Sequence, residues 1–96
     1  MFSEPITATT VALMLLLGHE DMTVTTQAIV TEAQRYDVDP ILIGALIQEE
    51  SGFDWKAQGL QGEVGLMQLS LSLIAREKVT PYQARQPRVN IALGTK

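Results

Sequence analysis

Glu50 is the residue of this sequence that is best placed to carry out acid–base chemistry. It ends an apolar, helix-patterned run over residues 40–50, and a short glycine-rich segment, residues 62–68, follows it. An acid set among aliphatic side chains favours its neutral form, because desolvation penalises the charged state, and a neutral carboxylic acid can donate a proton. This arrangement points toward an enzyme.

Glu49 and Glu63 are the competing acids, and we rank both below Glu50. In a helix Glu50 falls on one line with Ile47, while Glu49 falls on the neighbouring line with Leu46. Periodicity therefore does not choose between the two helical glutamates. A helix pattern alone is more typical of solvated charges at a helix end than of catalysis.

The helix that carries Glu50 has clear start signals. Asp39 is a natural N-cap, and Pro40 is a natural first helical residue because its missing N–H would have no partner there. An earlier helix is expected over residues 25–36. We expect Ile29 and Ala33 on its buried face together with Tyr36, and Glu32 elsewhere.

The second half of the chain is expected to be more irregular. Residues 51–62 read as a loop pinned by Phe53 and Trp55. A short extended piece at 64–69 should precede a helix from Ser70 or Ser72. Pro81 and Pro87 bracket an expected polar connection, and residues 88–93 should open a last helix. The predicted fold class is thus all-α in the main, in a single domain.

The N-terminal run Val11–Leu17 is too short to span a membrane, which takes about 20 residues of helix. Because no Lys or Arg occurs before Arg35, a secretory signal is not indicated either. We expect residues 1–25 to contain a buried helix of unassigned role.

Composition excludes several functions. The chain lacks cysteine and has one histidine, His19, so no metal site and no cofactor are expected. Residues 1–55 hold nine acidic residues and one basic residue, whereas residues 56–96 hold six basic and two acidic ones. We expect these halves to meet as complementary surfaces. The net charge of −4 makes nucleic acid an unlikely partner.

Three motifs in order resemble a known family. Glu50-Ser51-Gly52-Phe53, then Gly62-Glu-Val-Gly-Leu-Met-Gln68, then Val89-Asn-Ile-Ala-Leu-Gly-Thr-Lys96 are similar to successive motifs of the soluble lytic transglycosylase (SLT) domain. That family has a lysozyme-like fold. The resemblance covers about residues 26–96, and it implies a domain that is truncated at its C-terminus, before an Ala-Tyr-Asn motif.

The resemblance implies cleavage of the β-1,4 bond between N-acetylmuramic acid and N-acetylglucosamine in peptidoglycan, with a 1,6-anhydro product. Glu50 would be the catalytic acid and then the base, as a single carboxylate in place of the two in ordinary glycosidases. The implied location is the cell envelope, periplasmic or extracellular, and a phage or a secretion system could also use such a protein. Self-association or a larger envelope assembly is compatible with an incomplete groove.

The same resemblance assigns other positions. Ser51, Glu63, Gly65, Met67 and Gln68 match positions that line the sugar groove, with Gln68 able to hydrogen-bond an N-acetyl or hydroxyl group.

Gly62 and Asn90 match positions of the structural motif, and for Asn90 we expect a role in orienting a helix start. Two departures concern the surroundings of Glu50. Gly59 stands where many members have a serine that hydrogen-bonds the catalytic glutamate, and Glu63 replaces a common alanine.

Two functions of different classes follow from the sequence. The first is a peptidoglycan lyase, of which a lysozyme-type hydrolase is a variant. The second is a catalytically inactive helical module that binds glycan or another protein of an envelope machine.

Overall fold

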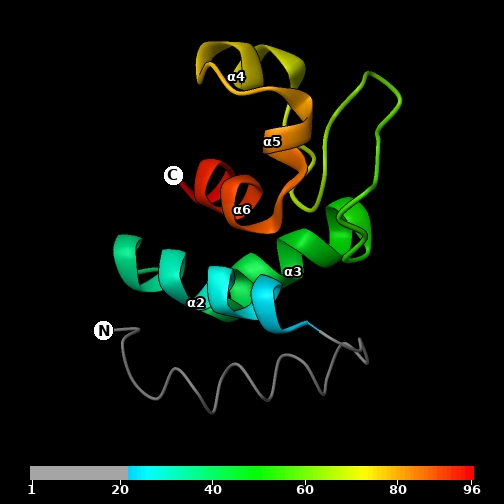
Figure 1. Cartoon of the computed structure of the whole chain (residues 1–96). Coiled ribbons are helices and arrows are strands. Elements are labelled where there is room, and N and C mark those ends of the chain that lie inside the picture. The colour runs from blue at the N-terminus through cyan, green and yellow to red at the C-terminus, as the bar shows by residue number, and fades with distance from the viewer. Residues whose placement is uncertain (1–21) are drawn as a thin grey trace.

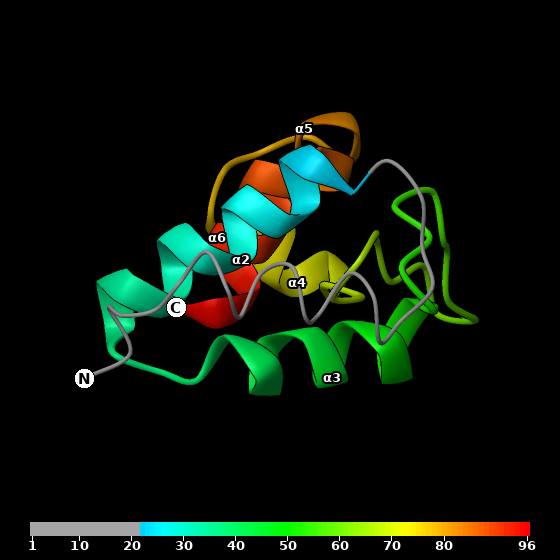
Figure 2. The same ribbon diagram turned by 90° about the horizontal axis from the view of Figure 1, so that it is seen from below.

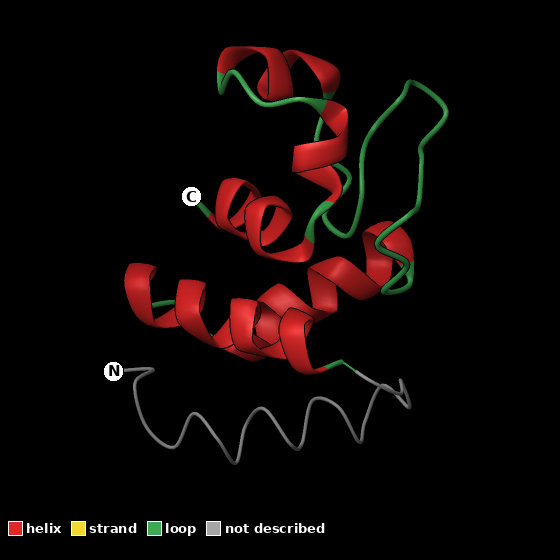
Figure 3. Cartoon of the chain, viewed as in Figure 1, coloured by secondary structure: helices red, strands yellow, loops and turns green. Residues whose placement is uncertain are grey.

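The computed structural model describes residues 22–96, and the expected N-terminal helix and His19 lie outside the described residues. This part of the chain is mainly helical, which confirms the predicted fold class (Figures 1 and 3). Its helices are α2 (Thr23–Tyr36), α3 (Pro40–Ser51), α4 (Leu71–Arg76), α5 (Pro81–Arg85) and α6 (Pro87–Thr95).

Helix α2 begins at Thr23, two residues earlier than expected, and so it crosses the expected boundary at residue 25. Ile29 and Ala33 are fully buried as predicted, but Tyr36 is exposed. Glu32, which we placed off the buried face, is itself buried. Its carboxylate lies 3.1 Å from Nε of the exposed Arg35, which supplies a counter-charge to the buried acid.

Helix α3 follows the sequence signals closely. The Asp39 side chain accepts a hydrogen bond from the Ile41 N–H at 2.9 Å, and Pro40 occupies the first turn. The helix ends at Ser51 and is capped by Gly52, which adopts a left-handed conformation (φ 61°) and whose N–H donates to the Gln48 carbonyl. This is the C-terminal geometry for which glycine is favoured.

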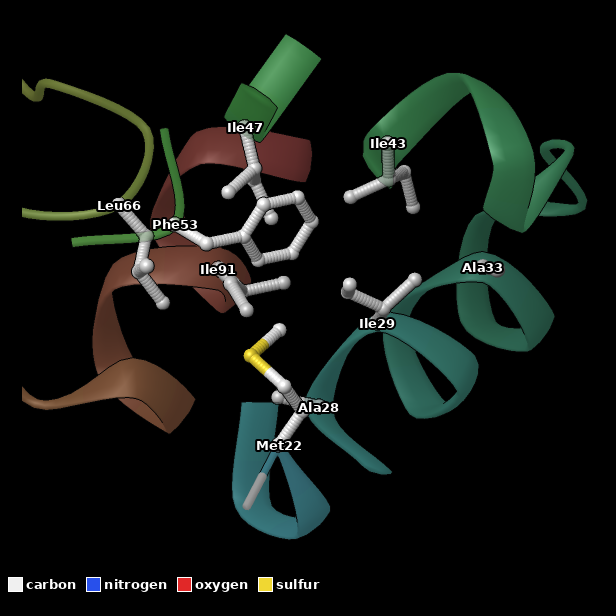
Figure 4. Packing of buried hydrophobic residues seen from close by; sticks show 9 residues of the cluster. All are labelled: Met22, Ala28, Ile29, Ala33, Ile43, Ile47, Phe53, Leu66 and Ile91. Atoms are coloured by element: carbon white, nitrogen blue, oxygen red, sulfur yellow. The ribbon is translucent and has the colours of Figure 1, made fainter. Parts of the chain in front are cut away.

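The main core lies where α2, α3 and α6 converge (Figures 1, 2 and 4). Ile29 of α2, Ile47 of α3 and Ile91 of α6 are each completely buried there. Two loop residues between α3 and α4 join them, Phe53 and Leu66. Within residues 22–96, the buried hydrophobic residues of this main core are Met22, Ala28, Ile29, Ala33, Ile43, Ile47, Phe53, Leu66 and Ile91.

A second, smaller core holds α4 and α5 on the rest of the domain. It is formed by Val64, Leu69, Ile74 and Ala84. The expectation of a polar connection between Pro81 and Pro87 was wrong, because each proline is instead the first residue of a helix. Thr80 caps α5 in a reciprocal capping box, in which its hydroxyl accepts from the Gln83 N–H at 3.0 Å and the Gln83 side chain accepts from the Thr80 N–H at 2.8 Å.

Of the expected extended piece at 64–69, only the first and last residues have strand-like pairing. Val64 and Leu69 pair with each other through two backbone hydrogen bonds, of 2.9 and 3.0 Å. The four residues between them form turns. Helix α4 begins directly after this turn. Its N-cap is Ser70, which is one of the two residues at which we predicted the helix to start.

Two ion pairs occur among residues 22–96, and they do not test the expected meeting of the two charged halves. Arg35 pairs with Glu32, and Lys96 pairs with Glu77 at 3.2 Å, so each of these ion pairs joins residues of the same half. None of the helices within residues 22–96 has the length and apolar character that a membrane crossing requires.

Candidate active site

Glu50 lies in the last turn of α3, three residues after the buried Ile47. Its side chain is exposed, and so is that of Glu49 beside it. The expectation that aliphatic side chains surround Glu50 was therefore wrong for this structure. The physical reason is that Ile47 is the last residue of α3 that packs into the core. Glu50 lies almost one turn further on, next to the end of the helix at Ser51.

The chain behind Glu50 leaves the helix through two consecutive left-handed residues, Gly52 and Phe53, with φ of 61° and 65°. Positive φ in an aromatic residue is strained, by about 1–3 kcal/mol. Burial of the Phe53 ring against Ile47 and Leu66 in the main core offsets this strain (Figure 4). The ring thereby fixes the direction of the loop directly after the candidate acid.

The glycine-rich segment folds back on this loop. Gly65 is buried, has φ of 75°, and donates its N–H to the Ala57 carbonyl at 2.9 Å. Val64 forms an isolated bridge with Gln58. A Cβ at Gly65 would lie 2.5 Å from Nδ2 of Asn90, so that only glycine fits here without a shift of its neighbours.

Asn90 of α6 holds the segment in place. Its side chain is completely buried, and all of its amide groups have partners. Oδ1 accepts from the Met67 N–H at 2.7 Å, while Nδ2 donates to the carbonyls of Val64 and Ala84 at 2.9 Å each. One side chain thus ties α5, α6 and the glycine-rich turn together, which goes beyond the orientation of a helix start.

Gln68 is anchored by its own amide nitrogen. Nε2 donates to the carbonyls of Ala57 and Gly65, at 3.2 and 2.9 Å. Since an amide nitrogen has two hydrogens, both are used within the loop, and Oε1 is the group left to contact a ligand. Gln68 would therefore recognise a donor, such as a hydroxyl or the N–H of an acetamido group.

Two other predicted site residues make internal contacts. The Ser51 hydroxyl donates to the Ile47 carbonyl at 3.1 Å, one turn back along α3. The side chain of Met67 lies over Gly94, where a Cβ would come 2.5 Å from its sulfur, and the Thr95 hydroxyl contacts that sulfur at 3.9 Å. Met67 therefore packs between the two cores.

The side chain of Glu63 occupies the space that a side chain at Gly59 would need. The Glu63 carboxylate accepts a hydrogen bond from the Gln61 N–H at 3.0 Å and lies directly over the Cα of Gly59. A Cβ at position 59 would clash with this carboxylate and would lie 2.7 Å from Oε1 of Gln68. The two departures from the family pattern thus occupy the same space. Gly62, with φ of 83°, allows Leu71 to pack close to the loop.

The structure joins four of the eight predicted site residues by direct contacts. Gly65, Met67 and Asn90 form one hydrogen-bonded or close-packed unit with the anchored Gln68. Glu50 is connected to this unit through the core, because its helix contributes Ile47 to the cluster that holds Leu66.

Trp55 was expected to pin the loop together with Phe53. Instead, the indole is 40% exposed, whereas Phe53 is only 8% exposed. Nζ of Lys56 lies 5.4 Å from the indole centroid, within the range of a cation–π contact. In the described range 22–96, no group of three or more His, Cys, Asp or Glu residues could hold a metal ion.

A mainly helical domain with an acid at the end of one core helix and a glycine-rich turn packed beside that helix is the architecture expected of a lysozyme-like domain. The model of the family described as "Transglycosylase SLT domain" matches residues 27–96, well over half of the chain. The chain belongs to this family.

Proposed function

We propose that this domain is a peptidoglycan lytic transglycosylase, with Glu50 as its general acid and then its general base. The observation that carries the proposal is membership of a transglycosylase family over residues 27–96, which include the Glu50-Ser51 pair and the complete glycine-rich motif. The buried hydrogen bonds of Asn90 support it, because they hold that motif rigid.

The reaction requires one proton donor and no water. Glu50 gives its proton to the glycosidic oxygen as the bond from C1 of N-acetylmuramic acid to that oxygen breaks. The C6 hydroxyl of the same sugar then bonds to C1, and the Glu50 carboxylate takes the hydroxyl proton. The carboxyl group is regenerated, and a 1,6-anhydro ring has formed.

The exposure of Glu50 defines what the substrate must contribute. An acid in contact with water lacks the low-dielectric surroundings that favour proton donation at neutral pH. A glycan strand laid over the end of α3 would exclude that water. The proposed enzyme therefore completes its catalytic environment only when substrate is bound.

The same exposure favours a second candidate function, a binding module of the cell envelope that does not cleave its ligand. Such a module needs the rigid motif but has no need of a buried acid. In both cases the proposed partner is the glycan strand of peptidoglycan, and the proposed location is the cell envelope.

The test is digestion of purified peptidoglycan, followed by mass analysis of the products. We expect anhydro-ended muropeptides, each lighter by one water than the hydrolytic product, with the parent protein and none with Glu50→Gln. The matched control is Glu49→Gln, because it changes the adjacent exposed acid and should retain activity.

The variant folds should be comparable, since surface substitutions usually change stability by less than about 0.5 kcal/mol. Ordinary reducing ends would indicate a hydrolase instead. Glycan binding without cleavage by the parent protein would establish the binding module. Activity lost with Glu49→Gln but kept with Glu50→Gln would overturn the assignment of the acid.

A further inference from the structure

Trp55 is the only tryptophan of the chain, and it is 40% exposed in the loop that follows the helix of Glu50. We infer that this indole stacks against a pyranose ring of the glycan, next to the sugar that Glu50 protonates. The inference rests on the proposed function and deepens it, because it assigns a substrate contact to a residue outside the three family motifs.

The backbone that carries the indole is ordered by two successive turns. The Asp54 N–H donates to the Ser51 carbonyl at 3.1 Å, and the Ala57 N–H donates to the Asp54 carbonyl at 3.0 Å. The Asp54 side chain also accepts from the Lys56 N–H at 2.9 Å. A ring presented on such a preordered loop binds a ligand with little additional loss of loop entropy.

The same turns keep Trp55 close to the end of α3. A turn closed by a hydrogen bond between residues i and i+3 holds their Cα atoms within about 7 Å. Since the next Cα is about 3.8 Å further on, the Cα of Trp55 lies within about 11 Å of that of Ser51. The backbone at Trp55 therefore lies near the end of α3 that carries Glu50, which precedes Ser51 directly.

On its other side, Trp55 adjoins the glycine-rich turn. Its carbonyl oxygen lies 3.5 Å from the position that a Cβ of Gly65 would occupy. Ala57, two residues on, accepts hydrogen bonds from both the Gly65 N–H and the Gln68 side chain. Trp55 is therefore part of the loop that connects the candidate acid to the anchored Gln68.

The surroundings of the indole fit a sugar better than a protein surface. Its exposed neighbours in the sequence, Asp54, Lys56 and Gln58, are polar, whereas protein-docking sites usually have a contiguous apolar centre. Nζ of Lys56 lies over one face of the ring, and the exposed Leu60 lies further along the same loop. The faces of a pyranose ring combine apolar C–H groups with hydroxyls at the rim. An aromatic face accepts the C–H groups, and the polar neighbours can hydrogen-bond the hydroxyls.

Intrinsic fluorescence tests this contact, because all tryptophan emission from the chain comes from Trp55. The protein is the full chain with Glu50→Gln to prevent turnover, and the probe is the β-1,4-linked tetramer of N-acetylglucosamine. Titration should shift the emission to shorter wavelength and protect it from iodide quenching. Calorimetry gives the affinity of the variants that lack tryptophan.

We expect Trp55→Ala to weaken tetramer binding about tenfold, and Trp55→Phe to weaken it only about two- to threefold, because a smaller ring keeps part of the stacking. The matched control is Tyr82→Ala, which removes an aromatic ring that is 71% exposed on α5 and should leave the affinity unchanged. Far-ultraviolet circular dichroism verifies that each variant is folded.

Tetramer binding with an unchanged emission spectrum, and with equal affinity in Trp55→Ala, would overturn the stacking contact. The proposed function would still stand if the parent protein released anhydro-ended muropeptides. If the parent neither cleaved peptidoglycan nor bound the tetramer, both the proposed function and the contact at Trp55 would be overturned.

Discussion

Replacing Asn90 tests whether the glycine-rich motif depends on a single buried amide. Asn90→Ala removes three hydrogen bonds at once, those to the Met67 N–H and to the carbonyls of Val64 and Ala84. The site is completely buried, so water cannot replace the lost partners without entering the core. We therefore predict a large loss of stability from a small change in volume.

The three losses are unequal. The Val64 carbonyl keeps a second donor, the Leu69 N–H at 3.0 Å, so its contribution is small. The Met67 N–H and the Ala84 carbonyl each lose the partner described above, at about 1–3 kcal/mol for a buried group left unsatisfied. The sum is about 2–6 kcal/mol, a large fraction of the roughly 5–15 kcal/mol by which such a domain is stable.

Urea unfolding followed by circular dichroism measures this change, with the free energy of unfolding taken by linear extrapolation. Arg88→Ala is the matched control, because it truncates an exposed residue of the same helix and should change stability by less than about 0.5 kcal/mol.

A double-mutant cycle with Gly65 separates packing from hydrogen bonding. Gly65→Ala places a Cβ 2.5 Å from Nδ2 of Asn90 and also strains a backbone with φ of 75°. The clash disappears when Asn90 is alanine, while the backbone strain remains. The double variant should therefore be more stable than the sum of the single effects by about 1 kcal/mol or more.

Two results would refute this account. One is a loss below about 1 kcal/mol for Asn90→Ala, which would mean that the three hydrogen bonds contribute no more than one ordinary bond does. The other is strict additivity with Gly65→Ala. Amide exchange gives an independent measurement, because the Met67 N–H should exchange faster in Asn90→Ala than in the parent protein.

Two further changes test local features. Gly59→Ala should destabilise the domain by about 1 kcal/mol, because the new Cβ displaces the Glu63 carboxylate from the Gln61 N–H. The loss should be smaller in a Glu63→Ala background, where only the close contact with Oε1 of Gln68 remains; additive urea-unfolding energies would contradict the coupling. Asp39→Ala should lower the free energy of unfolding by about 1 kcal/mol in the same assay, whereas Asp39→Ser should leave it nearly unchanged because serine also caps a helix. Equal free energies of unfolding for the two variants would show that the capping hydrogen bond contributes nothing.

The sequence was sufficient to predict elements with strong local signals. The start of α3 at Pro40 depends on a cap and a proline that act within one turn, and the structure confirms it. The burial of Ile29 and Ala33 follows from helical periodicity over four turns of α2. Such features need no knowledge of what lies across the core.

Helix α5 was missed because proline has two opposite meanings in a sequence. Pro81 and Pro87 were taken as the borders of a connection, but proline is equally favourable as the first residue of a helix. A helix of five residues is too short to show periodicity. The usable signal was Thr80 with Gln83 three residues later, the spacing of a capping box.

The exposures of Glu50 and Trp55 could not be predicted from the sequence, because they depend on where the packed neighbours end. Periodicity aligned Glu50 with Ile47 but carried no information on how far the core extends beyond that residue. Likewise, Phe53 and Trp55 have similar apolar character, and only the direction of the chain after Gly52 sends one ring inward and leaves the other exposed.

These observations together constrain how the site could work. Met67 and Asn90 are committed to internal packing and hydrogen bonds, and so is the amide nitrogen of Gln68. The exposed side chains among the candidate residues are those of Glu50 and Trp55, while Gln68 is half-buried. A sugar stacked on the indole would bring apolar surface close to the end of α3 and displace water there. Since exclusion of water favours the protonated form of a carboxyl group, which is the form that can donate a proton, the stacking contact and the acid would act in sequence, binding first and proton transfer second.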